Sequence, residues 1–348
     1  MVPVVDLTRR GRAHADTFAA VARRVAESGS VLLGDETAAF EAEFATWLDA
    51  RHVVAVSSGA SALQLALAGL GIGQGDEVIL PAFTAVPTAA AVCALGATPV
   101  FVDVDAETAG IDSAAVDAAR TSRTRAVIVV HLYGRQVSIP DIDIPVVEDA
   151  AQAHGAISDH ARSAAVIYSF YPTKNLGGIG DGGAVVTSNA ALADAVRRRR
   201  VHGLTHDYLH EEISQNFRIS ELEAGWLRIC LPDVRAGNAR RREIAEHYRR
   251  QAPGLVWHAP STAHVYHLAV ARVAGRDQFR SILADLGVAT ATHYPKALTQ
   301  QPAYRRYVRD RCPESEQWAA ECVSLPCFPE LTDDEIEHVG QALAKVTS

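Results

Sequence analysis

Short apolar runs alternate with alanine-rich stretches from about residue 52 to residue 188. The apolar runs have the length of buried strands and cover 53–56, 77–80, 99–103, 126–130, 145–148, 166–170 and 184–187. The alanine-rich stretches between the early runs predict helices near 60–71, 84–95 and 112–120. Strands that alternate with helices pair mostly in parallel. This half of the chain therefore predicts an α/β fold with a large, mostly parallel, seven-stranded sheet.

The pattern changes after a long helical segment that covers about residues 219–251. Pro232 interrupts this segment, and a proline inside a helix kinks or breaks it. We therefore predict a large domain over residues 1–232 and a smaller one over 233–348. The smaller domain reads as α+β, and its predicted elements are a strand at 267–273, a helix at 276–286, a strand at 288–293 and a final helix after the capping pattern Thr332-Asp-Asp-Glu335.

Composition excludes several classes of protein. The 348 residues are 48% hydrophobic, which is enough for a large core, and the net charge of −8 comes without a basic stripe that would bind nucleic acid. No apolar run has the length of a membrane span, and the arginine-rich first thirty residues lack the apolar segment of a signal peptide, so we expect a cytoplasmic protein. The five cysteines form no C-x-x-C pair, so neither a disulfide framework nor a metal site is predicted.

Lys174 lies between the apolar run 164–170 and the glycine-rich segment 177–183. A lysine at a strand end becomes nucleophilic when burial or a nearby cation lowers its pKa, and it then forms Schiff bases with aldehydes such as pyridoxal phosphate. Most lysines in glycine-rich loops are simply solvated. The assignment of Lys174 as a reactive amine therefore depends on its neighbours.

The glycine-rich segment also contains a match to the dinucleotide-binding fingerprint G-x-G-x-x-G, in Gly178-Ile-Gly-Asp-Gly-Gly183. That fingerprint requires a helix directly after the glycines. Here residues 184–187 read as another strand, so we reject a dinucleotide site. We expect the glycines to let the backbone turn sharply and pass close to a ligand or a neighbouring subunit.

Two other strand ends carry matching chemistry. Ser57-Ser-Gly-Ala-Ser61 follows the first strand and opens a helix, so its free backbone N–H groups and hydroxyls could hold a phosphate. Asp149 ends an apolar strand, and a buried acid needs a cationic partner such as a protonated pyridine nitrogen. A phosphate site, an acid and then a lysine is the order found in fold type I pyridoxal phosphate enzymes.

Short motifs follow one another in a fixed order along about residues 30–345. They include Ser58-Gly-Ala-Ser-Ala-Leu63, His131-Leu-Tyr-Gly134, Glu148-Asp-Ala-Ala-Gln152, the Lys174 segment, Asn216-Phe-Arg-Ile-Ser-Glu-Leu-Glu-Ala224 and His293-Tyr-Pro295. In this arrangement the chain resembles the DegT/StrS family of nucleotide-sugar aminotransferases. The resemblance implies a fold type I aminotransferase with a small C-terminal domain, pyridoxal phosphate as cofactor, and a homodimer whose active sites are shared between subunits.

The resemblance also implies a role for each matching residue. Lys174 would bind the cofactor covalently and shuttle a proton, and Asp149 would hold the pyridinium nitrogen. The other implied cofactor contacts are Gln152 at the ring hydroxyl, Ala151 at a ring face, Ser169, Gly59, Ala60 and Ser61 at the phosphate, Ala85 beside the ring, and Asn216 at the phosphate of the neighbouring subunit.

The lysine also indicates the reaction. Relatives that dehydrate sugars carry histidine at this position, so Lys174 favours transamination, usually with glutamate as the donor. The Lys-Asn-Leu-Gly and Gly-Asp-Gly-Gly sequences resemble those of enzymes that aminate 3-keto-6-deoxyhexoses linked to thymidine diphosphate. Tyr171, His293 and Tyr294 match positions that line the sugar pocket in that subgroup.

Some positions depart from the family pattern. Ala60 lacks a hydroxyl that relatives offer to the phosphate, Ala85 replaces an aromatic residue over the ring, and Asp207 precedes Tyr208 where relatives commonly place a lysine. The last change keeps a second acceptor open, a free keto-cyclitol or keto-sugar. A third reading is a non-catalytic homologue that binds pyridoxal phosphate, but the joint presence of Lys174, Asp149 and Gln152 argues against it.

Overall fold

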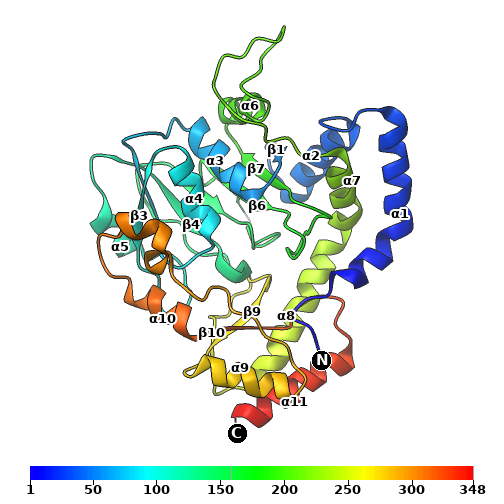
Figure 1. Ribbon diagram of the computed structural model, residues 1–348, viewed down its shortest axis with the longest axis vertical. Helices are drawn as coiled ribbons and strands as arrows, with labels where there is room; N and C mark the ends of the chain where they lie inside the picture. The colour runs from blue at the N-terminus through cyan, green and yellow to red at the C-terminus, as the bar shows by residue number, and fades with distance from the viewer. Residues whose placement is uncertain (158, 348) are drawn as a thin grey trace.

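The computed structural model describes residues 1–157 and 159–347. Within these ranges the core is a seven-stranded sheet (Figure 1) made of β1 (His52–Val56), β2 (Glu77–Pro81), β3 (Thr98–Val102), β4 (Thr124–Val130), β5 (Val146–Asp149), β6 (Ala165–Ser169) and β7 (Gly183–Thr187). The strand order is β1-β7-β6-β5-β4-β2-β3. Of these described strands, β7 runs antiparallel to both of its neighbours, and the pairs from β6 to β3 are parallel. The predicted mostly parallel sheet is confirmed.

Helices cover both faces of this sheet. They are α1 (Leu7–Ser28), α2 (Asp35–Leu48), α3 (Gly59–Gly69), α4 (Val86–Ala94), α5 (Ser113–Ala119), α6 (Ala190–Arg199) and α7 (Glu221–Cys230). Because successive strand residues point to opposite faces, Val54 and Val56 pack with α3, α4 and α6, whereas Val53 and Ala55 pack with α2 and α7. Helix α5 covers the β2–β4 half of that second face, and α1 packs outside α7. The sheet thus lies between two helical layers.

Pro232 lies where the long helical segment is interrupted, as the sequence predicts. Helix α7 ends at Cys230, a 3-10 turn η2 (Leu231–Asp233) follows, and α8 (Val234–Gln251) continues the path. Helix α8 leads from the large sheet into the C-terminal part of the chain (Figure 1). A domain boundary at residue 232 remains our prediction.

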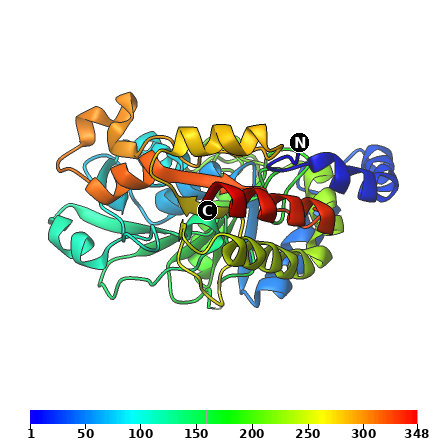
Figure 2. The same ribbon diagram turned by 90° about the horizontal axis from the view of Figure 1, so that it is seen from below.

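The C-terminal part is built around a smaller, three-stranded antiparallel sheet. Its elements are β8 (Val256–Trp257), β9 (Ala269–Arg272), α9 (Arg276–Asp285), η3 (Leu298–Gln300), η4 (Pro302–Tyr307), α10 (Pro313–Glu321), β10 (Cys322–Leu325) and α11 (Asp333–Thr347). Helices α8, α9 and α11 share one apolar core with β9 and β10, and α8 and α11 lie side by side (Figure 2). The predicted cap of the last helix is present, since Thr332 and Glu335 each accept a backbone N–H of the other.

The strand predicted at 288–293 is wrong. That segment forms two isolated bridges, from Val288 to Val2 and from Ala291 to Ser324, rather than a ladder. The third strand of the small sheet is β8 instead. The bridge to Val288 also brings Val2, at the start of the chain, into the C-terminal core. Among the described helices, none is long and apolar enough to cross a membrane.

Candidate active site

The predicted site residues gather where neighbouring strands of the large sheet end. Asp149 ends β5, Ser169 ends β6, and Ser57 follows β1, on the far side of β7. Lys174 lies five residues beyond the end of β6, in the loop that leads to β7. Ligands of open α/β sheets bind outside the carboxyl ends of parallel strands. The structure therefore brings together the three groups that the sequence places far apart.

The turn before α3 has the form of an anion cradle. Ser58 caps the helix, and its hydroxyl accepts the N–H of Ser61 at 3.0 Å. The hydroxyl of Ser61 lies 2.9 Å from that of Ser57 and 2.8 Å from that of Ser58. The first N–H groups of α3 have no partner within the helix, as at every helix start. Hydroxyls and free N–H groups thus converge at one end of an eleven-residue helix.

Two glycines allow this turn to pack against the sheet. A β-carbon on Gly59 would lie 2.6 Å from the β-carbon of Ser169, so the turn sits directly against that serine. A β-carbon on Gly183 would lie 2.3 Å from the carbonyl group of Ser58. Ser169 and the Gly59–Ser61 turn therefore lie side by side, as a shared phosphate site requires.

Asp149 offers a buried carboxylate to a cation. Its Oδ2 accepts the hydroxyl of Thr88 at 3.0 Å, and its Oδ1 accepts the N–H of Ala151 at 3.1 Å. Burial raises the pKa of Asp149, while these two hydrogen bonds and the charge of Lys174 act in the opposite direction. A further cationic partner, such as a protonated ring nitrogen, would hold this acid ionised.

Lys174 has a perturbed amine. Burial lowers its pKa to about 8, and the carboxylate of Asp149 partly offsets that effect. At neutral pH a useful fraction of the amine is therefore unprotonated and nucleophilic. The sequence contains two other lysines, Lys296 and Lys345, and both lie on exposed positions.

Gln152 is held in one orientation. Its Oε1 accepts the N–H of Tyr133 at 2.7 Å, so its Nε2 is the group left to donate, and it points to the hydroxyl of Tyr294 at 3.2 Å. Tyr133 lies in the short helix η1 (Leu132–Gly134), and its own hydroxyl donates to the carbonyl of His293. These contacts link the large sheet to the segment around residues 293–294.

The predicted substrate residues lie close to this region. Burial, followed by the charge of Lys174, lowers the pKa of His293 to about 4, and its Nδ1 lies 2.8 Å from the hydroxyl of Ser324. Burial also raises the pKa of Tyr294, so its hydroxyl keeps its proton. Tyr171 is 53% exposed beside the lysine loop. Ala85 precedes α4, the helix that supplies Thr88 to Asp149.

The glycine-rich turn makes its close contacts within its own chain. A β-carbon on Gly177 would lie 2.1 Å from the carbonyl oxygen of Pro172, and one on Gly178 would lie 1.5 Å from Oε1 of Glu223. The indole N–H of Trp226 donates to the carbonyl of Gly177 at 3.0 Å. A strand follows the turn, as predicted. Tight packing against α7 explains why several positions of the turn are occupied by glycine.

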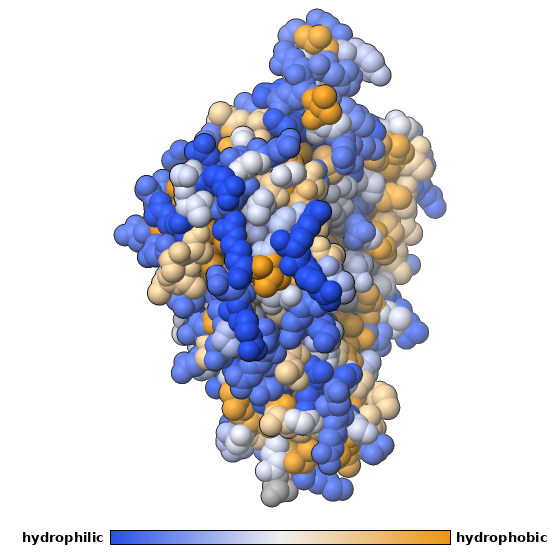
Figure 3. Space-filling view, turned by 60° about the vertical axis from the view of Figure 1, so that its left-hand side comes forward, coloured by the Kyte–Doolittle hydropathy of each residue, from blue (hydrophilic) through white to orange (hydrophobic). Residues whose placement is uncertain are grey.

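Asn216 lies on an exposed segment. Its side-chain oxygen accepts the Nε of Arg218 at 2.9 Å, while the carbonyl of the next residue, Phe217, accepts the N–H of Ser57. The loop that Asn216 ends, residues 201–216, projects beyond the body of the molecule (Figure 1) and carries hydrophobic side chains on its surface (Figure 3). In this loop Ile213 is 102% exposed and Tyr208 is 86% exposed.

Thr88 and Tyr133 are two site residues that sequence reasoning missed. Each holds a predicted residue, Asp149 or Gln152, through a contact between distant parts of the chain. Tyr133 lies within the motif His131-Leu-Tyr-Gly134, whose place after a predicted strand was the available signal.

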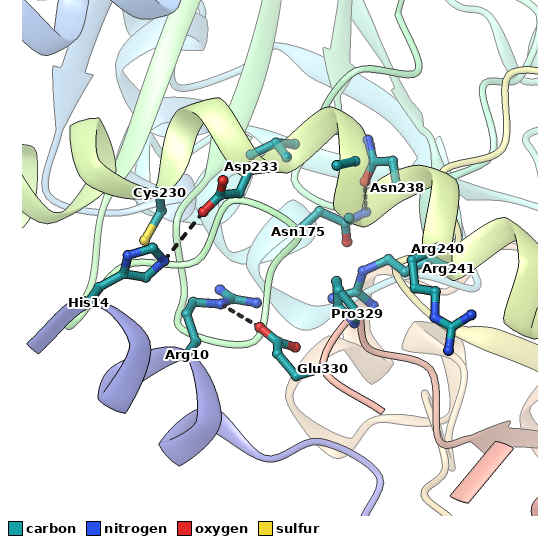
Figure 4. A pocket seen from close by; sticks show the side chains of 13 residues that line it. Arg10, His14, Asn175, Cys230, Asp233, Asn238, Arg240, Arg241, Pro329 and Glu330 are labelled. Atoms are coloured by element: carbon teal, nitrogen blue, oxygen red, sulfur yellow. Dashed lines mark hydrogen bonds and ion pairs between the residues drawn. The ribbon is translucent and has the colours of Figure 1, made fainter. Parts of the chain in front are cut away.

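A cavity of about 350 Å³ lies beside the lysine loop but contains none of the predicted site residues (Figure 4). Asn175 and Asn238 both line this cavity, and the amide nitrogen of Asn175 donates to the side-chain oxygen of Asn238 at 2.7 Å. The same nitrogen donates to the carbonyl of Val265 at 3.0 Å. The residue after Lys174 is thus tied to α8 and to the C-terminal part of the chain.

The site's groups fit pyridoxal phosphate. The turn at Ser57–Ser61 offers donors to a phosphate, Asp149 offers a carboxylate to a ring nitrogen, and Lys174 offers an amine to an aldehyde. Among the described residues, no group of three or more His, Cys, Asp or Glu side chains could hold a metal ion.

Comparison with known proteins agrees with this chemistry. The model of the DegT/DnrJ/EryC1/StrS aminotransferase family matches residues 13–344. The chain is 42% identical over 361 residues to a dTDP-3-amino-3,4,6-trideoxy-alpha-D-glucose transaminase of Streptomyces venezuelae, covering 98% of this chain and 95% of the relative. The crystal structure of DesV from S. venezuelae superimposes with a TM-score of 0.93 at 40% identity, covering 99% of this chain and 98% of that one. The structure of NtdA from Bacillus subtilis with bound cofactor PMP gives a TM-score of 0.94 at 27% identity, covering 99% and 85%.

Proposed function

The chain belongs to the DegT/DnrJ/EryC1/StrS aminotransferase family, and from this membership we propose that it aminates the keto group of a nucleotide-linked deoxysugar. The observation that carries the proposal is the amine of Lys174, whose pKa burial lowers to about 8, at the same strand ends as the buried carboxyl of Asp149. An aminotransferase needs such an amine and such an acid.

Pyridoxal phosphate is the cofactor, and when bound it supplies an electron sink for the carbanion formed during transamination. We propose that Asp149 holds its ring nitrogen and that Gln152 donates to its ring hydroxyl. Ser169, Gly59, Ala60 and Ser61 would hold the phosphate, and Ala85 and Ala151 would lie beside the ring.

In this proposal Lys174 is the proton carrier. Its Nζ removes the proton from the α-carbon of the amino donor and later returns a proton to the sugar carbon that receives the nitrogen. A pKa of about 8 suits both tasks, because the amine can exist in either form near neutral pH.

For the acceptor we propose a dTDP-linked 3-keto-6-deoxysugar, with glutamate as the donor. The support is the similarity to the S. venezuelae relative, which is a transaminase for a dTDP-linked 3-amino sugar. Tyr171, His293 and Tyr294 would line the sugar pocket, since His293 and Tyr294 lie next to Tyr133 and Gln152.

We further propose a homodimer with shared sites, in the cytoplasm. The loop 201–216 exposes Tyr208, Leu209 and Ile213, which a second copy of the chain would cover. Asn216 is the last residue of this loop, so the same contact could carry Asn216 to the phosphate site of the partner.

The absorbance of the bound cofactor tests the proposal. Addition of glutamate should bleach the band of the aldehyde form, and one class of keto-sugar should restore it. Recovery with a dTDP-linked 3-keto-6-deoxysugar would support the proposed acceptor. A band that no amino donor bleaches would leave a non-catalytic cofactor-binding protein as the better reading.

A free keto-cyclitol or keto-sugar is the second candidate acceptor. The exposed carboxylate of Asp207, next to Tyr208 on the projecting loop, would repel a diphosphate rather than bind it. If the free ketose alone restores the absorbance band, this candidate replaces the nucleotide-linked one.

A further inference from the structure

Glu223 is a buried acid that holds the turn after Lys174. It lies in the first turn of α7, its backbone N–H is capped by the hydroxyl of Ser220, and its side chain is 3% exposed. Oε2 of Glu223 accepts the N–H of Gly180 at 2.8 Å. Together with the indole of Trp226 at Gly177, this contact ties the turn to α7 at two points.

The other oxygen of Glu223, Oε1, is buried and accepts no hydrogen bond of normal geometry, although the N–H of Ile179 also faces the carboxyl and lowers its pKa. A β-carbon on Gly178 would lie 1.5 Å from Oε1 and 2.9 Å from the carbonyl oxygen of Phe170, so both oxygens occupy the space beside Gly178. Two acceptors that face the same space repel each other unless a proton lies between them. The Phe170 carbonyl already accepts the N–H of Gly178 at 2.7 Å, and a proton on Oε1 can be donated to its second lone pair.

We propose that Glu223 is a positioning residue for Lys174 and acts in its protonated form. The neutral carboxyl joins the carbonyl of Phe170, the residue directly after β6, to the N–H of Gly180, and so closes the loop that carries Lys174. Loss of the proton leaves a buried charge beside a carbonyl oxygen and loosens the loop. The catalytic part of this inference rests on the proposed role of Lys174.

The surroundings of Glu223 agree with this assignment. Burial is the largest influence and raises its pKa to about 7; the N–H groups of Gly180 and Ile179 act against it, and the nearby carboxylate of Asp181 adds to the rise. Arg10, on α1, reaches the turn at Gly177 and pairs with Glu330. Burial also raises the pKa of Cys230, farther along α7, to about 12, so this thiol stays neutral. The proton of Glu223 is therefore lost as the pH rises through about 7.

The first test is thermal unfolding as a function of pH. Because the pKa of Glu223 is higher in the folded than in the unfolded chain, the folded state holds an extra proton between about pH 4.5 and 7, and stability falls as the pH rises through that window. Glu223→Gln keeps one donor and one acceptor but does not titrate. We expect its Tm to exceed that of the wild type by a few degrees at pH 8.5, and by much less at pH 5.

Glu27→Gln, on the exposed side of α1, is the matched control and should show no such trend. A Tm difference for Glu223→Gln that does not change with pH would overturn the proposal. This arm needs no substrate, so it decides the state of Glu223 even if the protein proves inactive with every keto-sugar.

The second test is the pH profile of kcat. We expect the kcat of the wild type to fall several-fold between pH 6.5 and 8.5 relative to Glu223→Gln, with a midpoint near 7, and kcat of Glu223→Ala to be low throughout. Parallel profiles for the wild type and Glu223→Gln would contradict a positioning role, whereas an inactive wild type with a pH-dependent Tm difference would instead count against the proposed function.

Discussion

The turn after Lys174 and the loop between α6 and α7 both belong to the part of the chain that forms the large sheet, but they are held in opposite ways. Residues 177–183 are tied to α7 through Glu223 and Trp226, and the space beside Gly177, Gly178 and Gly183 has no room for a side chain. The loop 201–216 projects from the body and exposes Ile213 completely.

The difference shows which region makes its contacts within one chain and which region leaves apolar side chains uncovered. The lysine turn finds its partners within the chain, so cofactor attachment should need correct folding of one subunit. The projecting loop leaves apolar side chains in water, which costs free energy unless a partner covers them. We therefore expect changes in the two regions to be distinguishable by their dependence on protein concentration.

The largest expected effect comes from Lys174. Lys174→Ala should remove covalent cofactor attachment and lower transamination by a factor on the order of 1,000 or more, since both the nucleophile and the proton carrier are lost. Reduction with borohydride, followed by peptide mapping, should find the pyridoxyl group on Lys174 and not on Lys296 or Lys345. A label on either of the other two lysines would contradict the assignment.

The pH dependence of attachment sharpens this prediction. With a pKa of about 8 for Lys174, about a tenth of the amine is neutral at pH 7. The rate at which pyridoxal phosphate attaches to the apoenzyme should rise with pH and level off above 8, whereas free Nα-acetyl-lysine, with a pKa of about 10.4, should continue to gain reactivity. A plateau near that of the free amino acid would show that burial does not act on this amine.

Gly178 tests how tightly the lysine turn is packed. Gly178→Ala should destabilise the fold by about 3 kcal/mol, because the added methyl group would lie 1.5 Å from Oε1 of Glu223. Gly180→Ala is the matched control, since its β-carbon would lie 3.4 Å from Oε2 and needs little adjustment. Urea unfolding gives both free energies. Equal losses for the two variants would show that the turn can move away from α7.

The strands and the chemical order of the site could be predicted from sequence, because both depend on local patterns. The seven apolar runs between residues 53 and 187 all form strands of the large sheet. Asp149, Ser169 and Lys174 lie near one another because parallel strands end at the same edge of that sheet. Contacts between distant segments left no such pattern. The bond from Thr88 to Asp149 joins residues 61 positions apart, and nothing local to either residue indicates it.

The wrong strand at 288–293 has a related cause. Its sequence is suited to an extended backbone, and Ala291 does exchange hydrogen bonds with Ser324. Val288 instead meets Val2, near the start of the chain, so the segment pairs with two distant partners at one point each. Sequence patterns predict extended backbone, but they do not predict which partner an edge will meet.

The projecting loop should show a smaller effect that depends on concentration. Replacing Leu209 and Ile213 together by serine removes exposed apolar side chains, so the isolated chain should keep its stability. If a second copy covers this loop, the variant should dissociate more readily and lose roughly tenfold in activity at low protein concentration. Light scattering after size-exclusion chromatography measures the first effect. A dimer that is unchanged by the double substitution would move the interface elsewhere.

Substitution of Ala60, at the predicted phosphate site, should give the smallest effect. This residue occupies the first turn of α3, between Gly59 and Ser61, where its backbone N–H can serve a phosphate but its side chain cannot. Ala60→Thr would add a hydroxyl worth about 1 kcal/mol, or roughly fivefold in the affinity for pyridoxal phosphate. Ala60→Val has nearly the same shape without the hydroxyl, so a matching gain in that variant would assign the effect to packing. A gain in affinity for the threonine variant alone would place the phosphate at this turn. Only a ligand at the start of α3 can distinguish the hydroxyl of threonine from the methyl group of valine.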